Sequence, residues 1–196
     1  KSLNSREIIC GYAEILKSSL LDSIKKFKYL DNNLNSILKL KQPFIENAIL
    51  NSCNLKKMVV QKDEDEKNLR KILNLGHTFA HAFESCLGFS SKLNHGEAVI
   101  IGITIALEFS CQRRLIKNKT YNFIKKHLER IPLKKKFTNI FNKQDVSKII
   151  SFMKSDKKNT TKKINIILIK DFGKIKTNYQ FDQNTLKQFL ISELKK

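Results

Sequence analysis

The sequence contains few residues of the kinds that interrupt a chain. Among its 196 residues there are 2 Pro, 6 Gly and no Trp, whereas 41% of the residues are hydrophobic. The low Pro and Gly content excludes collagen-like and low-complexity chains, and the hydrophobic fraction excludes an intrinsically disordered one. We therefore expect a folded chain, whose length allows one large domain or two small ones.

Cysteine is also sparse, and no two cysteines form a CxxC pair. The four lie far apart, at Cys10, Cys53, Cys86 and Cys111. This spacing favours free thiols in a reducing compartment over a disulfide framework. The longest largely apolar stretch, Ala98 to Leu107, is far shorter than the ~20 residues of a membrane helix, and no basic-then-apolar signal segment opens the chain. The sequence thus predicts a cytoplasmic protein with no membrane partner.

Acidic residues are few relative to basic ones. The chain has 38 Lys and Arg against 18 Asp and Glu, which gives a net charge of +20. Such a field attracts nucleic acids, anionic membranes or phosphorylated metabolites. Arginine, whose planar fork suits base recognition, is rare here, and lysine supplies most of the charge. Lysine-rich solvated faces are therefore favoured over a nucleic-acid-binding module, which stays an alternative.

Helical periodicity dominates the first three-quarters of the chain. The segment after His95 is apolar on nearly all sides, which predicts a central buried helix. Shorter helices are predicted at Thr120–Arg130, Val146–Lys154 and Thr185–Leu194. The long helices are predicted from Arg6 with Ser5 as cap, from Pro43 with Ile45, Ala48, Ile49 and Val59 facing inward, from Leu69 to Leu87 with Gly88 ending it, and from His95 to Cys111.

Only one segment has the pattern of β-strands. Ile164–Ile169 and Lys174–Thr177 flank a turn that contains Gly173, which predicts a hairpin. Because one hairpin is not an independent domain, we expect a single, mainly α domain over residues 1–196 with this minor hairpin. The sequence contains no glycine-rich phosphate loop of the GxGxxG or GxxxxGK type.

Three of the four histidines lie within one short stretch, at His77, His81 and His95. His77 and His81 are four residues apart, so on a helix both imidazoles could reach one metal ion. The metalloprotease pattern requires Glu after the first His, where Thr78 stands. Spacing alone leaves two interpretations open, a metal site and ordinary polar histidines, with a solvated capping role for His95.

Other polar groups accompany these histidines. Glu14 lies in an apolar stretch, and a carboxylate buried there needs a cation. The alternative is a half-exposed Glu14 beside Lys17. Arg70 and Asn74 precede His77 by seven and three residues, and a continuous helix would place them on its face. This stripe suits a polyhydroxylated anionic ligand, although a solvated helix face explains the spacing equally well.

Several motifs in order carry a resemblance to a known family. The segments Asp63–Glu84 and Leu93–Gly102 closely resemble the 3-dehydroquinate synthase family. Gly11–Lys17 is similar to its first metal-ligand helix, and Ser155–Lys158 to its late basic motif. Ala80 stands where the family commonly has Gly, which leaves the histidine spacing intact. The match runs from about Arg6 to the hairpin.

The resemblance implies the helical C-terminal domain of a two-domain enzyme. The N-terminal, Rossmann-like domain that holds most NAD contacts is then absent, which agrees with a chain that begins at Lys1 instead of Met. The resemblance assigns Glu14, His77 and His95 to zinc, or to another divalent metal such as cobalt. It assigns His81, Lys17 and Asn74 to catalysis, and Lys56 (or Lys57), Arg70, Asn74 and one of Lys157 and Lys158 to the substrate.

The implied reaction converts 3-deoxy-D-arabino-heptulosonate 7-phosphate to 3-dehydroquinate and phosphate in the shikimate pathway. This chemistry is that of an NAD- and zinc-dependent carbon–oxygen lyase, which we expect to be inactive as this isolated domain and to form a homodimer. The alternative within enzymes is another sugar-phosphate cyclase with the same metal triad.

Overall fold

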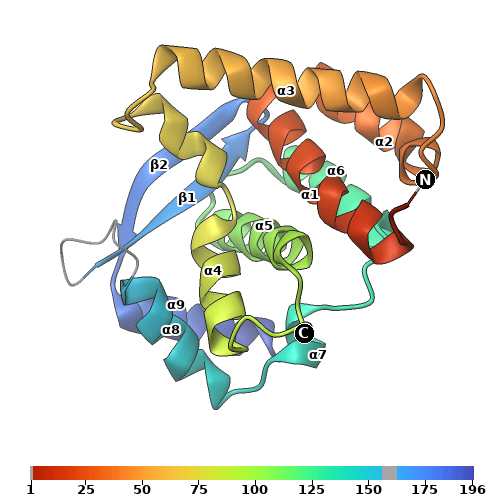
Figure 1. The fold of residues 1–196 in the computed structure, drawn as a ribbon. Helices are drawn as coiled ribbons and strands as arrows, with labels where there is room; N and C mark the ends of the chain where they lie inside the picture. The colour runs from red at the N-terminus through yellow and green to blue at the C-terminus, as the bar shows by residue number, and fades with distance from the viewer. Residues whose placement is uncertain (1, 156–162) are drawn as a thin grey trace.

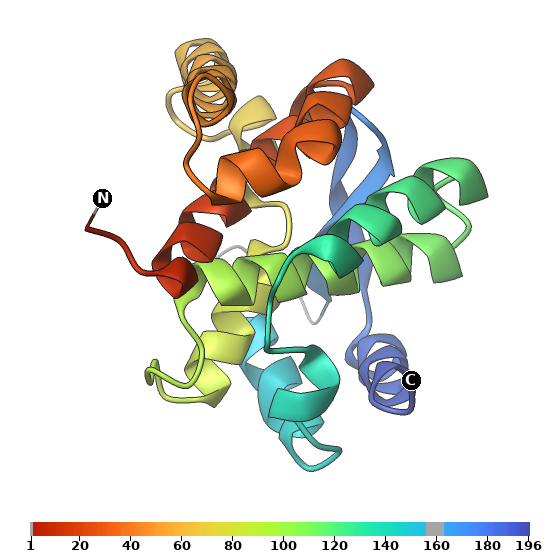
Figure 2. The ribbon, with the colours of Figure 1, turned by 90° about the vertical axis from the view of Figure 1, so that its right-hand side faces the viewer.

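Helix α5 (His95–Gln112) runs through the middle of the molecule, and other elements cover it on several sides (Figures 1 and 2). Nearly every residue from Gly96 to Ser110 is buried. Helices α1 (Ser5–Asp22), α4 (His77–Cys86) and α6 (Asn118–Arg130) and strand β1 (Ile164–Asp171) pack against it. The predicted central helix is therefore confirmed, and a helix that is apolar all round is explained by its position in the core.

The structure, a computed structural model, describes residues 2–155 and 163–196, with side chains up to residue 154 before the gap. This part of the chain is mainly helical with one antiparallel hairpin, as the sequence predicts. The remaining elements are α2 (Ile24–Leu38), α3 (Phe44–Lys62), the 3₁₀ helix η1 (Leu69–Asn74), α7 (Phe137–Ile140), α8 (Asp145–Ser155), β2 (Lys174–Phe181) and α9 (Gln183–Glu193).

Several predicted boundaries are corrected by the structure. Asn4, not Ser5, caps α1, because the Asn4 side chain accepts from the backbone N–H groups of Arg6 and Glu7. The helix predicted over Leu69–Leu87 is interrupted, so η1 and α4 are separate elements. Ile49 is 48% exposed instead of facing inward, whereas Ala48 and Val59 are buried. Helices α2 and α7 were not predicted.

The hairpin covers one side of α5 and extends further than predicted. β1 and β2 pair antiparallel from Ile164 opposite Phe181 to Asp171 opposite Lys174. Strand β1 is buried at Ile164 and from Ile166 to Ile169. Strand β2 alternates between exposed and half-buried residues, as expected of a strand with one face in solvent. All four cysteines are free, as expected. Within the described ranges, every helix is too short or too polar to cross a membrane.

Two glycines of α5 let the neighbouring helices come unusually close. A Cβ on Gly96 would lie 2.3 Å from the Cα of Cys10 in α1, and a Cβ on Gly102 would lie 2.2 Å from the carbonyl oxygen of Gly76. Gly76 itself has φ +79°, a left-handed conformation that favours glycine, directly before α4 begins at His77. These contacts fix how α1 and α4 meet α5.

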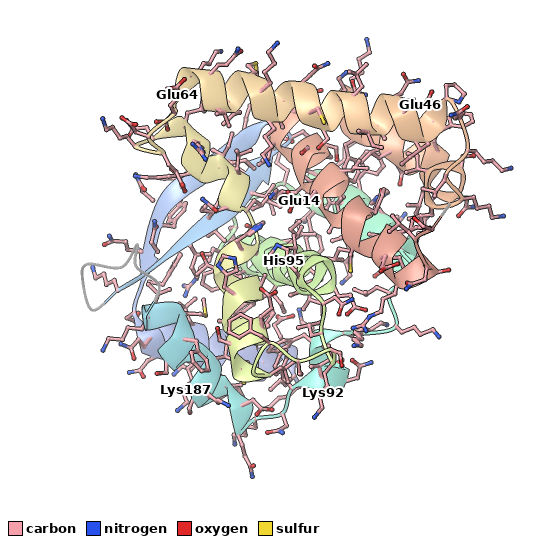
Figure 3. All side chains as sticks on the ribbon, viewed as in Figure 1. Glu14, Glu46, Glu64, Lys92, His95 and Lys187 are labelled. Atoms are coloured by element: carbon pink, nitrogen blue, oxygen red, sulfur yellow. The ribbon has the colours of Figure 1, made fainter. Side chains whose placement is uncertain are left out.

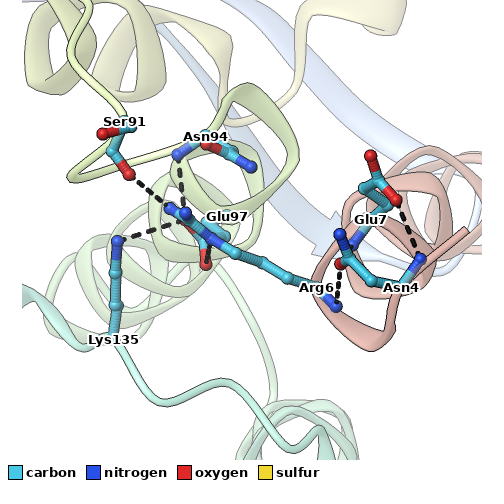
Figure 4. A network of polar contacts seen from close by, with 7 residues as sticks. All are labelled: Asn4, Arg6, Glu7, Ser91, Asn94, Glu97 and Lys135. Carbon is cyan, nitrogen blue, oxygen red and sulfur yellow. Dashed lines mark hydrogen bonds and ion pairs between the residues drawn. The ribbon is translucent and has the colours of Figure 1, made fainter.

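A buried carboxylate ties the start of α1 to the start of α5 (Figure 4). The Arg6 guanidinium donates to both oxygens of Glu97, at 2.8 and 2.6 Å, and also to the carbonyl oxygen of Ser91. Glu97 in turn accepts from the backbone N–H of Asn94. Burial disfavours ionisation of Glu97, but Arg6 and this N–H outweigh it and lower the Glu97 pKa. The pair therefore fixes α1 beside the first turn of α5.

Candidate metal and anion site

Three side chains with metal-binding atoms meet where α1, α4 and α5 converge. Glu14 comes from the middle of α1, and His77 and His95 are the first residues of α4 and α5. One ligand atom from each lies within 4.8 Å of the others. Figure 3 shows Glu14 and His95 close together near the centre of the view. Because 81 residues separate Glu14 from His95, only the tertiary packing brings them together.

Both histidines are oriented by hydrogen bonds through Nδ1. The His77 Nδ1 lies 3.2 Å from the carbonyl oxygen of Leu75, which can only accept, so this nitrogen carries the proton. The His95 Nδ1 lies 3.1 and 3.2 Å from the two carboxylate oxygens of Glu84. In both rings Nε2 is then the nitrogen with a free lone pair. The His77 Nε2 lies 3.8 Å from Glu14 Oε1.

The charge states at this cluster suit a cation. Burial and the nearby Lys17 ammonium lower the pKa of His77 to about 4, so its imidazole is neutral at neutral pH. Burial disfavours the charged form of Glu14, but the hydrogen bond and charge of Lys17 outweigh it and lower the Glu14 pKa. Two imidazoles and one carboxylate form a donor set found in zinc sites that keep an open position. The residues therefore fit a divalent metal.

Lys17 lies beside Glu14 in a cleft that Glu14, His77 and His95 also line. It is buried, and its Nζ lies 3.0 and 2.8 Å from the two oxygens of Glu14, one turn earlier on α1. Burial lowers the Lys17 pKa, although Glu14 partly offsets this. The cleft has a volume of about 450 Å³ and is lined by Glu14, Lys17, Ser18, Ser52, Cys53, Lys56, Glu66, Arg70, Leu73, Asn74, His77 and His95.

The acidic turn before η1 positions Arg70 at this cleft. The Asp63 carboxylate accepts from the backbone N–H groups of Arg70 and Asn68, each at 2.8 Å. The Arg70 guanidinium donates to the carbonyl oxygen of Glu64 at 2.5 Å. The run of acidic residues is therefore a local scaffold, which closes the turn and directs Arg70 toward the cleft.

Asn74 and Glu66 form a second polar pair at the cleft. The Asn74 amide donates to Glu66 Oε1 at 2.6 Å. Asn74 lies at the end of η1, and the left-handed Gly76 separates η1 from α4, which begins at His77. Arg70, Asn74 and His77 thus line one cleft without sharing a helix face, and the predicted stripe is wrong in its geometry.

Most of the residues named from the sequence line this cleft, but some do not. His81 is exposed and absent from the lining, with its ring centroid 5.4 Å from that of His77 and 6.1 Å from that of His95. His81 instead belongs with Glu84 and His95 to a second group of donor atoms within 4.8 Å. Lys57 is exposed outside the lining. Lys157 and Lys158 lie outside the described residues.

Two acidic residues at the site were missed from the sequence. Glu66 is the last of four consecutive acidic residues, and the sequence does not show which of the four bonds Asn74. Glu84 follows His77 by seven residues, two helical turns, and that spacing was the available signal.

Comparison with known proteins finds similarity to 3-dehydroquinate synthases. The family described as 3-dehydroquinate synthase C-terminal matches residues 11–159. A 3-dehydroquinate synthase of Pelagibacter ubique (strain HTCC1062) is 48% identical over 195 residues, which are 100% of this chain and 53% of the relative. One of Thermoanaerobacter sp. (strain X514) is 37% identical over 186 residues, or 95% of this chain and 51% of that relative. The chain thus spans about half the length of these relatives.

Two solved structures with the same fold are those of other synthases. A 2-deoxy-scyllo-inosose synthase complexed with carbaglucose-6-phosphate, NAD+ and Co2+ matches with a TM-score of 0.77 at 21% identity, covering 97% of this chain and 53% of that one. The 2-epi-5-epi-valiolone synthase of Streptomyces hygroscopicus subsp. jinggangensis 5008, with NAD+ and Zn2+ bound, matches with a TM-score of 0.76 at 19% identity, covering 97% and 52%. At these identities the likeness concerns the fold.

Proposed function

The chain belongs to the 3-dehydroquinate synthase family, whose C-terminal part it matches, and from that premise we propose that it forms the metal- and substrate-binding part of an enzyme that converts 3-deoxy-D-arabino-heptulosonate 7-phosphate to 3-dehydroquinate and phosphate. The observation that carries this proposal is that metal-donor atoms and basic side chains line the same cleft. The Glu14, His77 and His95 donors adjoin a wall that contains Lys17, Lys56 and Arg70. A polyhydroxylated substrate with a phosphate and a carboxylate needs both.

We propose Glu14, His77 and His95 as the residues that hold zinc, or another divalent metal such as cobalt. The bound ion would make substrate hydroxyls easier to deprotonate, and NAD would supply reversible oxidation of a substrate alcohol. The support comes from the donor set and from the metal and NAD+ named for the structural relatives. We assign NAD mainly to an N-terminal Rossmann-like domain, since the relatives are about twice as long as this chain.

The basic and amide side chains of the cleft would bind and orient the substrate. Lys56 and Arg70 reach the cleft from α3 and η1 and carry the positive charge that a phosphate or carboxylate requires. Lys17 is held by Glu14 at the metal side, where it would orient the substrate hydroxyls. Asn74 offers an amide to the same ligand. We propose Lys157 and Lys158 as further phosphate contacts on the basis of the family motif.

His81 would move protons near the cleft. Its exposed ring lies beside His77 and His95, so it can exchange protons with solvent and stay close to the reacting atoms. An elimination of phosphate needs a proton acceptor, and a histidine side chain is a common general base.

Zinc content of purified variants tests the metal assignment. Two groups of donor atoms are candidates for the metal: Glu14, His77 and His95, or His81, Glu84 and His95. His95 is common to both, so the matched variants His77→Ala and His81→Ala distinguish the two groups. We expect about one zinc per chain in the wild type, loss of zinc in His77→Ala and His95→Ala, and retention in His81→Ala. Loss in His81→Ala with retention in His77→Ala would place the metal on Glu84 instead and overturn the assignment.

Phosphate release by the full-length protein tests the reaction. We expect release from 3-deoxy-D-arabino-heptulosonate 7-phosphate with NAD present, and none by the isolated chain, because the domain proposed to hold NAD is then missing. Turnover of a hexose phosphate in its place would favour another sugar-phosphate cyclase, the fold relatives' class of reaction. Salt-dependent DNA binding by a chain without metal would favour the nucleic-acid-binding alternative.

We further propose that the enzyme is a cytoplasmic homodimer. Helix α3 exposes Ile49, Leu50 and Met58, with 48%, 57% and 45% of each residue accessible. Such apolar side chains along one helix suit contact with the N-terminal domain or with a second subunit. Sedimentation of the full-length protein measures the oligomeric state, and a monomer at micromolar concentration would contradict the dimer.

A further inference from the structure

Glu84 is a buried carboxylate whose role the proposed reaction does not explain. Its side chain is 11% exposed, on the side of α4 that packs against α5. A charged group in such a position requires a hydrogen-bonding partner, because burial of an unpaired carboxylate is costly. The His95 Nδ1 provides that partner at 3.1 and 3.2 Å.

His95, by contrast, is not held by its own surroundings. Its side chain is 53% exposed, and it is the first residue of α5, beyond the closely packed part of that helix. An exposed imidazole samples several rotamers and both neutral tautomers. Only the tautomer protonated on Nδ1 leaves the Nε2 lone pair for a metal, and the Glu84 carboxylate accepts a bond from that tautomer alone.

We infer that Glu84 is a positioning residue that holds His95 in the Nδ1-protonated tautomer and directs Nε2 toward Glu14 and His77; this inference rests on the proposed metal site. His77 has the equivalent support from the carbonyl oxygen of Leu75. A substitution cannot remove the backbone carbonyl of Leu75, but it can remove the Glu84 carboxylate. Removing such a partner typically weakens metal binding by about 10–100-fold.

The first test measures the His95 tautomer in the metal-free chain, so its result does not depend on zinc binding or on activity. Long-range ¹H–¹⁵N correlation spectra distinguish the two tautomers of His95. We expect the Nδ1-protonated form in the wild type, and a mixture or the other tautomer in Glu84→Ala. Glu108→Ala is the matched control, because Glu108 is a half-buried glutamate on α5 that bonds Tyr121 and not a histidine. An unchanged His95 tautomer in Glu84→Ala would overturn the inference.

The second test measures zinc affinity by competition with a chelator. We expect Glu84→Ala to raise the zinc Kd by about 10–100-fold, and Glu84→Gln, which keeps the shape and one acceptor oxygen, to raise it less. Glu108→Ala should leave the Kd unchanged. A wild-type Kd in Glu84→Ala contradicts the positioning role. If the wild type binds no zinc, the proposed function fails, and the tautomer spectra still decide whether Glu84 holds His95.

Discussion

Arg70 is attached to the acidic turn and not to the metal-binding donors, so its contribution can be separated from theirs. We predict that Arg70→Ala in the full-length protein weakens substrate binding by about 10–100-fold, because a charge-assisted hydrogen bond contributes about 1.5–3 kcal/mol. Zinc content should stay at the wild-type level. Calorimetric titration with substrate and elemental analysis measure the two quantities.

Lys57→Ala is the control for Arg70→Ala. It removes the same charge from an exposed position outside the cleft lining. Equal loss of affinity in both variants would mean that the general positive field, and not Arg70 at the cleft, attracts the substrate.

His127 connects three helices from inside the core. Its ring is fully buried, with Nε2 2.7 Å from the Tyr12 hydroxyl and Nδ1 2.9 Å from Asp31. Arg130 donates to the same Asp31 oxygen at 2.8 Å. Burial lowers the His127 pKa and outweighs the opposing effect of Asp31. The imidazole is therefore neutral in the folded protein at neutral pH.

This lowered pKa predicts acid sensitivity of the fold. In the unfolded chain the imidazole takes up a proton near its ordinary pKa of about 6.5. The unfolded state thus binds more protons, and the free energy of unfolding should fall as the pH drops below that value. Urea denaturation at pH 7.5 and 5.5 measures the change. His127→Gln should lose less stability than the wild type over this interval, and an equal loss would assign the sensitivity to other groups.

At the scale of elements, the crossing of α1 and α5 at Gly96 sets the distance between two proposed metal ligands. We predict that Gly96→Ala lowers the free energy of unfolding by about 1–3 kcal/mol, because its Cβ would overlap the Cys10 backbone. The same shift moves α1 relative to His95, so zinc affinity should fall as well. Denaturant titration and chelator competition measure the two effects.

Gly11 provides the matched control on the opposite helix. No atom lies within 4 Å of a Cβ built at Gly11, which is an interior position of α1. Gly11→Ala should therefore raise stability by about 0.5–1 kcal/mol through helix propensity. Equal destabilisation by both substitutions would show that helix crossing is not what constrains Gly96.

The sequence predicted the elements whose signals are local. The apolar run after His95 indicated a central helix, and the helix predicted at Thr185–Leu194 corresponds to α9, which Asp182 caps. The break before His77 was missed because the left-handed Gly76 lies against Gly102, a contact between residues far apart in the chain. Helix α2 was also missed, since its lysines and asparagines masked the helical spacing of Phe27, Leu30, Leu34 and Ile37.

The candidate site was predictable only in part, for a similar reason. Spacing along the chain paired His77 with His81, and resemblance to a family replaced His81 with Glu14 and His95. The structure brings Glu14, His77 and His95 into one donor group. Glu84 stayed unnoticed because its partner His95 begins the next helix, so its two-turn spacing from His77 did not by itself reveal that contact.

For the molecule as a whole, the net charge of +20 is a poor guide to function. Figure 3 shows nitrogen-tipped side chains over the outside of the molecule in this view, while few basic residues line the cleft. The charges that we assign to a ligand are those of Lys17, Lys56 and Arg70, which line the cleft, and of Lys157 and Lys158, which lie outside the described residues. The remaining lysines are consistent with a solvated surface.

Because α5 lies in the core and η1 and α3 lie at its edge, the parts of the site should undergo local unfolding at different rates. His77 and His95 begin helices that pack closely on each other, whereas η1 contributes no buried residue and α3 buries only Ala48, Leu55 and Val59. We predict that amide hydrogens of α5 exchange slowest with deuterated solvent and those of η1 and the solvent side of α3 much faster, as mass spectrometry of peptides measures. Uniform exchange would contradict this. The residues that we propose to bind phosphate would then yield as ligand enters and leaves, while the proposed metal ligands hold their places.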